Sequence, residues 1–517
     1  MSNMVWEVLA FVLYLCLMII IGAIYSKKNE NSEDYFLGGR SLGGFVAGLS
    51  AQASDMSGWL LMGLPGAIFL TGLSGDGWVA IGLLVGTILN WLLIASPLRR
   101  YTIAAGNSVT LPSFFEHRYQ DKKKILMTIS SVIIALFFTV YTASAFASGG
   151  KLFHSVFGLD YTIALTIGAA VILAYTFLGG FMAVCTTDFI QGTLMIVGLL
   201  AVPIVALSFM KGDGLTVTQG LISNGVADPK TFTGFFDGTS ATSILSGFAW
   251  GLGYFGMPHI LVRFMAVRNE KEMSKSKVVA ITWVTLSLAF AAVIGIVGRA
   301  YMDVAMFKEI NPDGGTVTSE YIFIEMIKRI FTENMGAPII AGIFLCGILA
   351  AIMSTADSQL LVSASAIAED IYKGVINKKA DDKKVLTLSR IAIVIIAVIA
   401  YVIALDPDSS IMGLVSDAWA GLGAAFGPLV LMSLFWRRTN LQGAIAGLIS
   451  GALVVILWDY IPLMGGQTIG KATGLYSLLP GFVISLICII GASLATPAPS
   501  EEITKTFDAI KANKNEA

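Results

Sequence analysis

Charged residues are scarce in this sequence. Asp, Glu, Lys and Arg together make up 13% of the 517 residues, whereas 56% are hydrophobic. A water-soluble chain carries about 25% charged residues, so water cannot be the main solvent of this one. The formal net charge is only −1, which gives no sign of a nucleic-acid partner or of an acidic substrate.

Cysteine and histidine are also rare. The four cysteines stand singly in apolar stretches without a Cys-x-x-Cys pair, which argues against a disulfide framework and against a zinc site. The three histidines, His117, His154 and His259, are far apart. Neither a histidine metal cluster nor a serine-histidine-aspartate centre is therefore supported, and an intramembrane enzyme is disfavoured.

Long apolar runs are what the sequence has instead. Runs of about 20 residues fit a bilayer core of about 30 Å. Thirteen such spans are predicted, at residues 5–26, 42–72, 77–98, 125–150, 160–180, 187–210, 241–265, 278–298, 337–366, 388–405, 410–435, 442–462 and 474–495. The first run has no basic residue before it and has Lys27 and Lys28 after it, the reverse of a cleaved signal peptide. We interpret it as a retained first span.

The distribution of Lys and Arg predicts the orientation, because cytoplasmic loops retain basic residues. With the amino terminus outside, most of the 33 basic residues fall on the inner side, above all in 99–124, 263–277 and 373–390. The prediction is an all-α membrane protein with thirteen transmembrane helices, its amino terminus outside and its carboxyl terminus inside. Residues 1–495 form one transmembrane domain, and residues 496–517 form a cytoplasmic tail that is either a solvated helix or a disordered end.

Spans 2 and 7 depart from plain helix. Residues 53–58 (Ala-Ser-Asp-Met-Ser-Gly) lie in the middle of span 2, and residues 247–258 of span 7 hold four glycines and a proline. Unwound backbone at membrane depth persists only where it lines a cavity or packs on protein. Interrupted helices five spans apart indicate inverted repeats with a binding site near the midplane. Packing through small residues alone is the simpler explanation of such glycines.

Asp55 lies about midway along span 2, where an ionised side chain costs at least ~2.5 kcal/mol unless something compensates it. A structural salt bridge is the simpler interpretation, but no Lys or Arg occupies the middle of a predicted span. In span 9, Ala351, Ser354, Thr355 and Ser358 share one helical face. Such hydroxyls often only bond a carbonyl of the preceding turn. Together with Asp55 they are a candidate cage for an alkali cation, which prefers hard oxygen ligands.

These segments resemble the sodium/solute symporter family, in particular its bacterial members that transport proline. The resemblance covers nearly the whole chain, and it is carried by residues 37–43, 53–66, 250–256, 353–355 and 418–421. It implies a leucine-transporter-like core of two inverted five-helix repeats, spans 2–6 and 7–11, in a bacterial plasma (inner) membrane. It also implies sodium-coupled uptake of L-proline by alternating access, with no obligatory protein partner.

The resemblance implies a main sodium site made by the backbone carbonyls of Ala53, Met56 and Ala351 and the hydroxyls of Ser354 and Thr355. Asp55 would act beside that site and tune its affinity for sodium. The residues implied to contact proline are Ser57, Gly58, Tyr141, Trp250, Tyr254 and Pro258. The last three are spaced i, i+4, i+8, which predicts a common helical face, although aromatic residues on a helix also serve ordinary packing.

Three positions depart from the pattern of the proline-transporting members. Met257 stands in place of a glutamine, Asp357 in place of a frequent serine, and Asp417 in place of an aromatic residue. In some members the region of Asp357 joins Asp188 in a further sodium site, so Asp188, Asp357 and Ser358 are a candidate second cation or proton site. The alternative is that Asp188 caps the start of span 6 and that Asp357 contacts water.

Other functions remain open at this point. A symporter of the same family for a sugar, sialic acid or pantothenate is the nearest alternative. A membrane sensor would need a signalling domain, and about twenty residues after the last span are too few to fold as one. A channel would need no pocket of the size of a solute.

Overall fold

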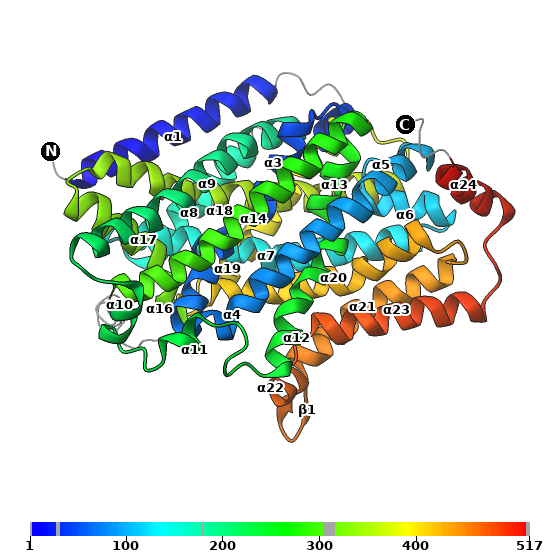
Figure 1. Ribbon diagram of the computed structural model, residues 1–517. Helices are drawn as coiled ribbons and strands as arrows, with labels where there is room; N and C mark the ends of the chain where they lie inside the picture. Colours follow the sequence, from blue (N-terminus) through cyan, green and yellow to red (C-terminus); the bar gives the residue numbers. More distant parts are fainter. Residues whose placement is uncertain (1–2, 27–31, 178–179, 303–315, 513–517) are drawn as a thin grey trace.

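The computed structural model describes residues 3–26, 32–177, 180–302 and 316–512, which form a bundle of long helices (Figure 1). The main helices are α1 (Asn3–Ser26), α3 (Gly44–Asp55), α4 (Leu64–Leu89), α5 (Ala95–Ala104), α7 (Ile125–Phe157), α8 (Tyr161–Thr176), α9 (Phe181–Gly212), α12 (Ala241–Ala249), α13 (Pro258–Ala266), α14 (Glu270–Tyr301), α18 (Pro338–Ser365), α19 (Asp382–Ile403), α20 (Ile411–Phe435), α21 (Leu441–Tyr460), α23 (Leu478–Ala495) and α24 (Glu501–Ala512).

Shorter elements join and extend these helices. The short α-helices are α2 (Ser32–Leu37), α6 (Leu111–Tyr119), α10 (Val217–Ser223), α11 (Pro229–Thr233), α16 (Thr316–Ser319), α17 (Ile322–Ile327) and α22 (Ile469–Thr473). The 3₁₀ segments are η1 (Gly38–Arg40) and η4 (Trp250–Gly256), and the π-helical segments are η2 (Trp59–Gly63), η3 (Asn90–Ile94), η5 (Lys328–Asn334) and η6 (Ala366–Ile376). Strands β1 (Pro462–Met464) and β2 (Gln467–Thr468) form an antiparallel hairpin, with Pro462 opposite Thr468.

Ten helical segments of the described residues are long and apolar enough to cross a membrane. The thirteen predicted spans exceed this number for three reasons. The helical segment Trp59–Ala104 continues through a sharp turn at Gly72 (φ 74°), and spans 2 and 3 therefore count as one segment. Span 5 falls on a shorter apolar helix, and span 7 is broken at η4. An all-helical, multi-pass membrane protein follows from the composition of these helices.

Among the helices long enough to cross a membrane, α18 and α20 are the most buried. In each of them, 83% of the most apolar stretch is buried, against 28% in α1. Helices α18 and α20 therefore form the interior, and α1 lies at the edge of the bundle (Figure 1). Helix α1 begins at one end of the bundle, whereas α24 lies at the other end (Figure 1).

The carboxyl-terminal tail takes the helical form of the two predicted alternatives, but one of its side chains is buried. Residues 501–512 form the helix α24, and the ring of Phe507 is buried against Tyr101 and the guanidinium group of Arg118. A docked apolar side chain explains why this helix is not simply solvated. Lys27, Lys28 and Lys514, which the sequence assigns to the inner side, lie outside the described residues.

Candidate functional site

The first predicted break is confirmed. Helix α3 ends at Asp55, residues Met56 and Ser57 are not helical, and the chain returns to helix at Gly58. The break is stabilised locally, because the hydroxyl of Ser57 accepts a hydrogen bond from the backbone N–H of Trp59 (3.3 Å). The indole N–H of Trp59 in turn donates to the carbonyl of Asp55 (2.9 Å), which satisfies one acceptor that the unwinding releases.

The second predicted break is also confirmed. Residues Trp250–Gly256 form the 3₁₀ segment η4, Met257 is extended, and α13 begins at Pro258. The carbonyl of Trp250 accepts a hydrogen bond from the indole N–H of Trp419 on α20 (2.8 Å). Gly253 permits this contact, since a Cβ atom there would lie 2.0 Å from Nε1 of Trp419. Each break thus has a tryptophan indole on a backbone carbonyl.

Helix α18 packs against the first break and brings several predicted sodium ligands together. The hydroxyl of Ser354 donates to the carbonyl of Ala53 (2.7 Å) and contacts that of Ala351 (3.1 Å). The next residue, Thr355, is fully buried, and its hydroxyl has no hydrogen-bond partner among the described residues. Met56 is likewise fully buried at the break. The result is a buried cluster of oxygen atoms between the unwound part of span 2 and α18.

The Asp55 side chain links the two breaks. Its Oδ2 atom accepts a hydrogen bond from the hydroxyl of Tyr254 (2.6 Å), which lies in η4. Its Oδ1 atom is buried and has no partner in the part of the chain that the structure describes. A buried carboxylate oxygen without a donor is unfavourable unless a cation or a proton approaches it. The Oδ1 atom of Asp55 could therefore bind a cation near Ser354 and Thr355.

The aromatic residues predicted to contact the solute lie around the same two breaks. Tyr254 packs edge-on against Trp419 (ring centroids 5.0 Å apart), and Trp250 stacks on Tyr476 (4.9 Å). Tyr141 of α7 is fully buried, and its hydroxyl is without a hydrogen-bond partner among the residues described. Gly58 lies against the same helix, since a Cβ atom there would be 2.3 Å from the Ser148 hydroxyl.

The predicted common helical face of Trp250, Tyr254 and Pro258 is wrong. That prediction requires α-helical spacing, but Trp250–Gly256 is a 3₁₀ segment followed by an extended residue. With three residues per turn, positions four apart no longer lie above one another. Pro258 lines a different cavity, which neither Trp250 nor Tyr254 lines.

Asp188 has a resident partner that the sequence did not reveal. Arg263 of α13 is buried, and its guanidinium group donates to Oδ2 of Asp188 (2.9 Å), to the hydroxyl of Ser358 (2.6 Å) and to that of Ser50 (2.8 Å). Arg263 falls in the predicted inner segment 263–277, although it also stands in the last turn of span 7. The position of Arg263 inside an apolar run is the sequence feature that indicates a buried charge in need of a partner.

The same cluster contains Asp357. Its Oδ1 atom contacts the hydroxyl of Ser358 (3.2 Å), whereas its buried Oδ2 atom has no partner in the described residues. Asp188 does not cap the start of span 6, because α9 begins at Phe181 with Gly180 as its N-cap. The cluster holds two carboxyl groups and one guanidinium group.

Two further contacts were not predicted. Lys151 of α7 is fully buried and forms an ion pair with Glu320 (2.6 Å). Glu320 also accepts the backbone N–H of Ile411 (2.8 Å) at the start of α20. Asp417, for which the sequence offered no interpretation, accepts a hydrogen bond from the hydroxyl of Tyr460. The Lys151–Glu320 ion pair joins elements far apart in sequence, whereas the Asp417–Tyr460 hydrogen bond joins the consecutive helices α20 and α21.

The chain matches known transporters over most of its length. The family model of the sodium:solute symporter family matches residues 35–451. The chain is 46% identical over 492 residues to the high-affinity proline transporter PutP of Bacillus subtilis (strain 168), which covers 95% of this chain and 98% of that protein. It is 44% identical over 502 residues to the sodium/proline symporter of Escherichia coli (strain K12), covering 96% and 94%.

A solved structure has the same fold. A sodium-coupled sialic acid symporter in a substrate-bound, outward-open state superimposes with a TM-score of 0.76 and 18% identity, over 96% of this chain and 98% of the other. The family model matches most of the chain, and both relatives are more than 40% identical to it over nearly its whole length. This chain belongs to the sodium:solute symporter family.

Proposed function

We propose that this protein is a secondary active transporter that couples sodium entry to the uptake of L-proline by alternating access. The observation that carries the proposal is the junction of the two broken helices. There the Asp55 carboxylate bonds Tyr254, and the Ser354 hydroxyl bonds the Ala53 carbonyl. The curated relatives named above are proline transporters and span almost the whole chain, which favours proline over a sugar or sialic acid.

Sodium is a co-transported substrate in this proposal. Its ligands are the carbonyls of Ala53, Met56 and Ala351 and the hydroxyls of Ser354 and Thr355. Ser354 gives its proton to a carbonyl and keeps its lone pairs for the ion, and the unpartnered Thr355 hydroxyl provides a second neutral oxygen. Oxygen ligands of this kind suit a hard cation. The free Oδ1 atom of Asp55 adds negative charge next to the site.

Proline is proposed to lie beside the same break. Its carboxylate is proposed to lie beside Ser57, at the positive end of the helix that resumes at Gly58. Tyr141, Trp250 and Tyr254 supply aromatic surface for its apolar ring. Pro258 lines the neighbouring cavity instead. We propose that it shapes the second break, because it is the first residue of α13.

A second cation or proton is proposed at Asp188, Asp357 and Ser358. Arg263 balances the Asp188 carboxylate, and the Oδ2 atom of Asp357 has no hydrogen-bond partner among the described residues. Two ionised carboxylates with one guanidinium group keep a net negative charge, which favours a bound cation or a proton. The charge moved per proline in reconstituted protein tests this assignment. A ratio of one charge per proline that is the same in Asp357→Ser would contradict it.

The membrane topology is part of the proposal. We propose thirteen spans in the bacterial plasma membrane, with the amino terminus outside, the carboxyl terminus inside, and inverted repeats at spans 2–6 and 7–11. The break in each half supports the repeats, and the position of α1 and α24 at opposite ends of the bundle supports an odd number of crossings. A single cysteine in place of Lys230, in a cysteine-free background, should react with an impermeant thiol reagent only from outside. A single cysteine in place of Lys384 should react only from inside.

Transport by purified protein in liposomes tests the function. Labelled L-proline should accumulate when sodium is higher outside than inside, and choline in place of sodium should abolish accumulation. Trp250→Ala should raise the proline concentration for half-maximal uptake more than the sodium concentration, whereas Trp250→Phe should have a smaller effect. Sodium-driven accumulation of a sugar, sialic acid or pantothenate, with proline neither transported nor competing, would refute the substrate while leaving the sodium coupling intact.

A further inference from the structure

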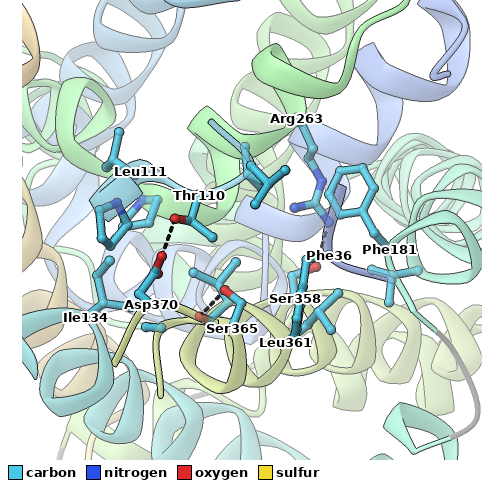
Figure 2. Close-up of a pocket in the computed structure, with 17 residues that line it drawn as sticks. Phe36, Thr110, Leu111, Ile134, Phe181, Arg263, Ser358, Leu361, Ser365 and Asp370 are labelled. Carbon is cyan, nitrogen blue, oxygen red and sulfur yellow. Dashed lines mark hydrogen bonds between the residues drawn. The ribbon is translucent and has the colours of Figure 1, made fainter. Parts of the chain in front are cut away.

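A narrow cavity, which we call the inner cavity, is lined in part by Arg263 and Ser358 of the proposed second cation site. Its wall is mostly apolar, and its polar residues are Thr110, Arg263, Ser358, Ser365 and Asp370 (Figure 2). Its free volume of about 20 Å³ is enough for one or two water-sized particles. Figure 2 shows Arg263 and Ser358 at one end of the cavity and Thr110 and Asp370 at the other.

One helix connects the proposed sodium site to the far end of the inner cavity. On α18 and its continuation η6, Ser358, Leu361, Ser365 and Asp370 line the cavity at intervals of three to five residues. The hydroxyl of Ser358 donates to the carbonyl of Ser354 (2.8 Å), so this stripe begins at the sodium site. At 1.5 Å per residue, Asp370 lies about 24 Å along the helix from Ser354.

Asp370 has a buried carboxylate group with one oxygen atom available to bind a cation. It is 1% exposed, and its Oδ1 atom accepts a hydrogen bond from the hydroxyl of Thr110 (2.6 Å). Its Oδ2 atom has no hydrogen-bond partner among the residues that the structure describes. Burying a carboxylate in this way is unfavourable unless a positive charge reaches it.

The charges around Asp370 are already paired with each other. Lys124 forms an ion pair with Glu116 (2.9 Å), and Lys373 forms one with Glu369 (3.1 Å). At the other end of the inner cavity, the charge of Arg263 is offset by Asp188. The carboxylate that faces the inner cavity with an unpartnered oxygen is therefore that of Asp370.

We propose that Asp370, together with the Thr110 hydroxyl, is a transient site for the sodium ion as it leaves toward the α6 end of the bundle. The proposal rests on the sodium coupling proposed above. The ion would pass from the hydroxyls of α18 along the Ser358–Ser365 stripe, and the Oδ2 atom of Asp370 would accept it there. Since Asp370 lies so far from Ser354, it does not contribute to sodium binding from the outside.

A purely structural role is the competing explanation. The hydroxyl of Thr110 also caps α6, because it accepts the backbone N–H of Ser113 (3.1 Å). Asp370 could then serve only to hold α6 against η6. Such a role would affect every mode of transport equally, whereas an exit site affects only the steps that release sodium inside.

Right-side-out membrane vesicles containing the full chain separate these explanations. In Asp370→Asn, net sodium-driven proline uptake should slow, and the lumenal sodium concentration that half-inhibits uptake should rise by up to about 100-fold, as expected for the loss of a unit charge about 5 Å from the ion. Proline exchange with saturating sodium on both sides should be unchanged, because exchange does not require sodium release. Activation by external sodium should also be unchanged.

Three further variants control the experiment. Asp370→Glu should retain most of the lumenal sodium effect, and Glu369→Gln, which removes an adjacent carboxylate that is already paired, should change it little. If Asp370→Asn does not reach the membrane, Thr110→Val gives the same test with one ligand removed. Equal loss of exchange and net uptake, or unaltered inhibition by lumenal sodium, would overturn the exit site. Absence of sodium-driven uptake in the unmodified protein would instead overturn the proposed function.

Discussion

At the scale of single residues, Asp55 stands out because one of its oxygens bonds Tyr254 and the other is free. A unit charge about 5 Å from a cation contributes about 3 kcal/mol at an effective dielectric near 20, or ~100-fold in affinity. Asp55→Asn should therefore raise the external sodium concentration for half-maximal uptake by up to that factor, and higher sodium should partly restore uptake. Asp76 of α4, whose carboxyl group accepts a hydrogen bond from the Thr71 hydroxyl (2.8 Å), provides the matched control Asp76→Asn. Normal sodium activation in Asp55→Asn would contradict the proposed site.

Thr355 offers a second test at this scale, because its buried hydroxyl has no partner in the described structure. A hydrogen-bonding group that meets an ion contributes about 1.5–3 kcal/mol. Thr355→Ala and Thr355→Val should each weaken sodium activation by about tenfold or more, while Thr355→Ser should stay near the unmodified protein. If Thr355→Val activates normally with sodium, the hydroxyl is not a ligand.

At the scale of elements, the close contact between the first break and α7 is critical. A Cβ atom on Gly58 would lie 2.3 Å from the Ser148 hydroxyl and 2.7 Å from its Cβ. Gly58→Ala should therefore destabilise the protein by about 1–3 kcal/mol, as overpacking does, and lower its melting temperature in detergent. Gly58→Ala combined with Ser148→Gly should recover most of the loss. A double variant no more stable than Gly58→Ala would show that the contact is not the cause.

The ion pair between Lys151 and Glu320 joins α7 to the start of α20. Removing one partner of a buried ion pair costs about 3–5 kcal/mol, because the other charge remains buried and unpaired. Lys151→Met should therefore lower the melting temperature more than the double variant Lys151→Met/Glu320→Gln, which leaves no charge and keeps an acceptor for Ile411. Thermal unfolding followed by tryptophan fluorescence measures both. The reverse order of stability would exclude this explanation.

At the scale of the whole molecule, the proposed symport must move charge. Proline is zwitterionic, so each sodium ion that enters with it carries a net positive charge inward. An inside-negative potential of 100 mV contributes ~2.3 kcal/mol per sodium, enough for roughly 50-fold accumulation. In liposomes with equal sodium on both sides, a potassium diffusion potential should therefore drive proline uptake. Uptake that ignores the potential would rule out electrogenic coupling.

Sequence patterns alone determined the features that depend on local composition and spacing. The apolar runs predicted helices that cross a membrane, the Gly-rich and Ser-Gly stretches predicted breaks at 53–58 and 247–258, and the i, i+3, i+4 spacing placed Ser354 and Thr355 on one helical face. These properties follow from the cost of exposing the backbone to lipid and from helical periodicity, both of which act within one segment.

Only the tertiary structure decided which distant groups meet. It pairs Asp55 with Tyr254, Arg263 with Asp188, and Lys151 with Glu320. It also replaces the expected face of Trp250, Tyr254 and Pro258 by a 3₁₀ turn. Partners separated by 75 to 199 residues, as for the first two pairs, leave no periodic signal. The energy of a buried charge depends on what packs around it, and that is a property of the folded bundle.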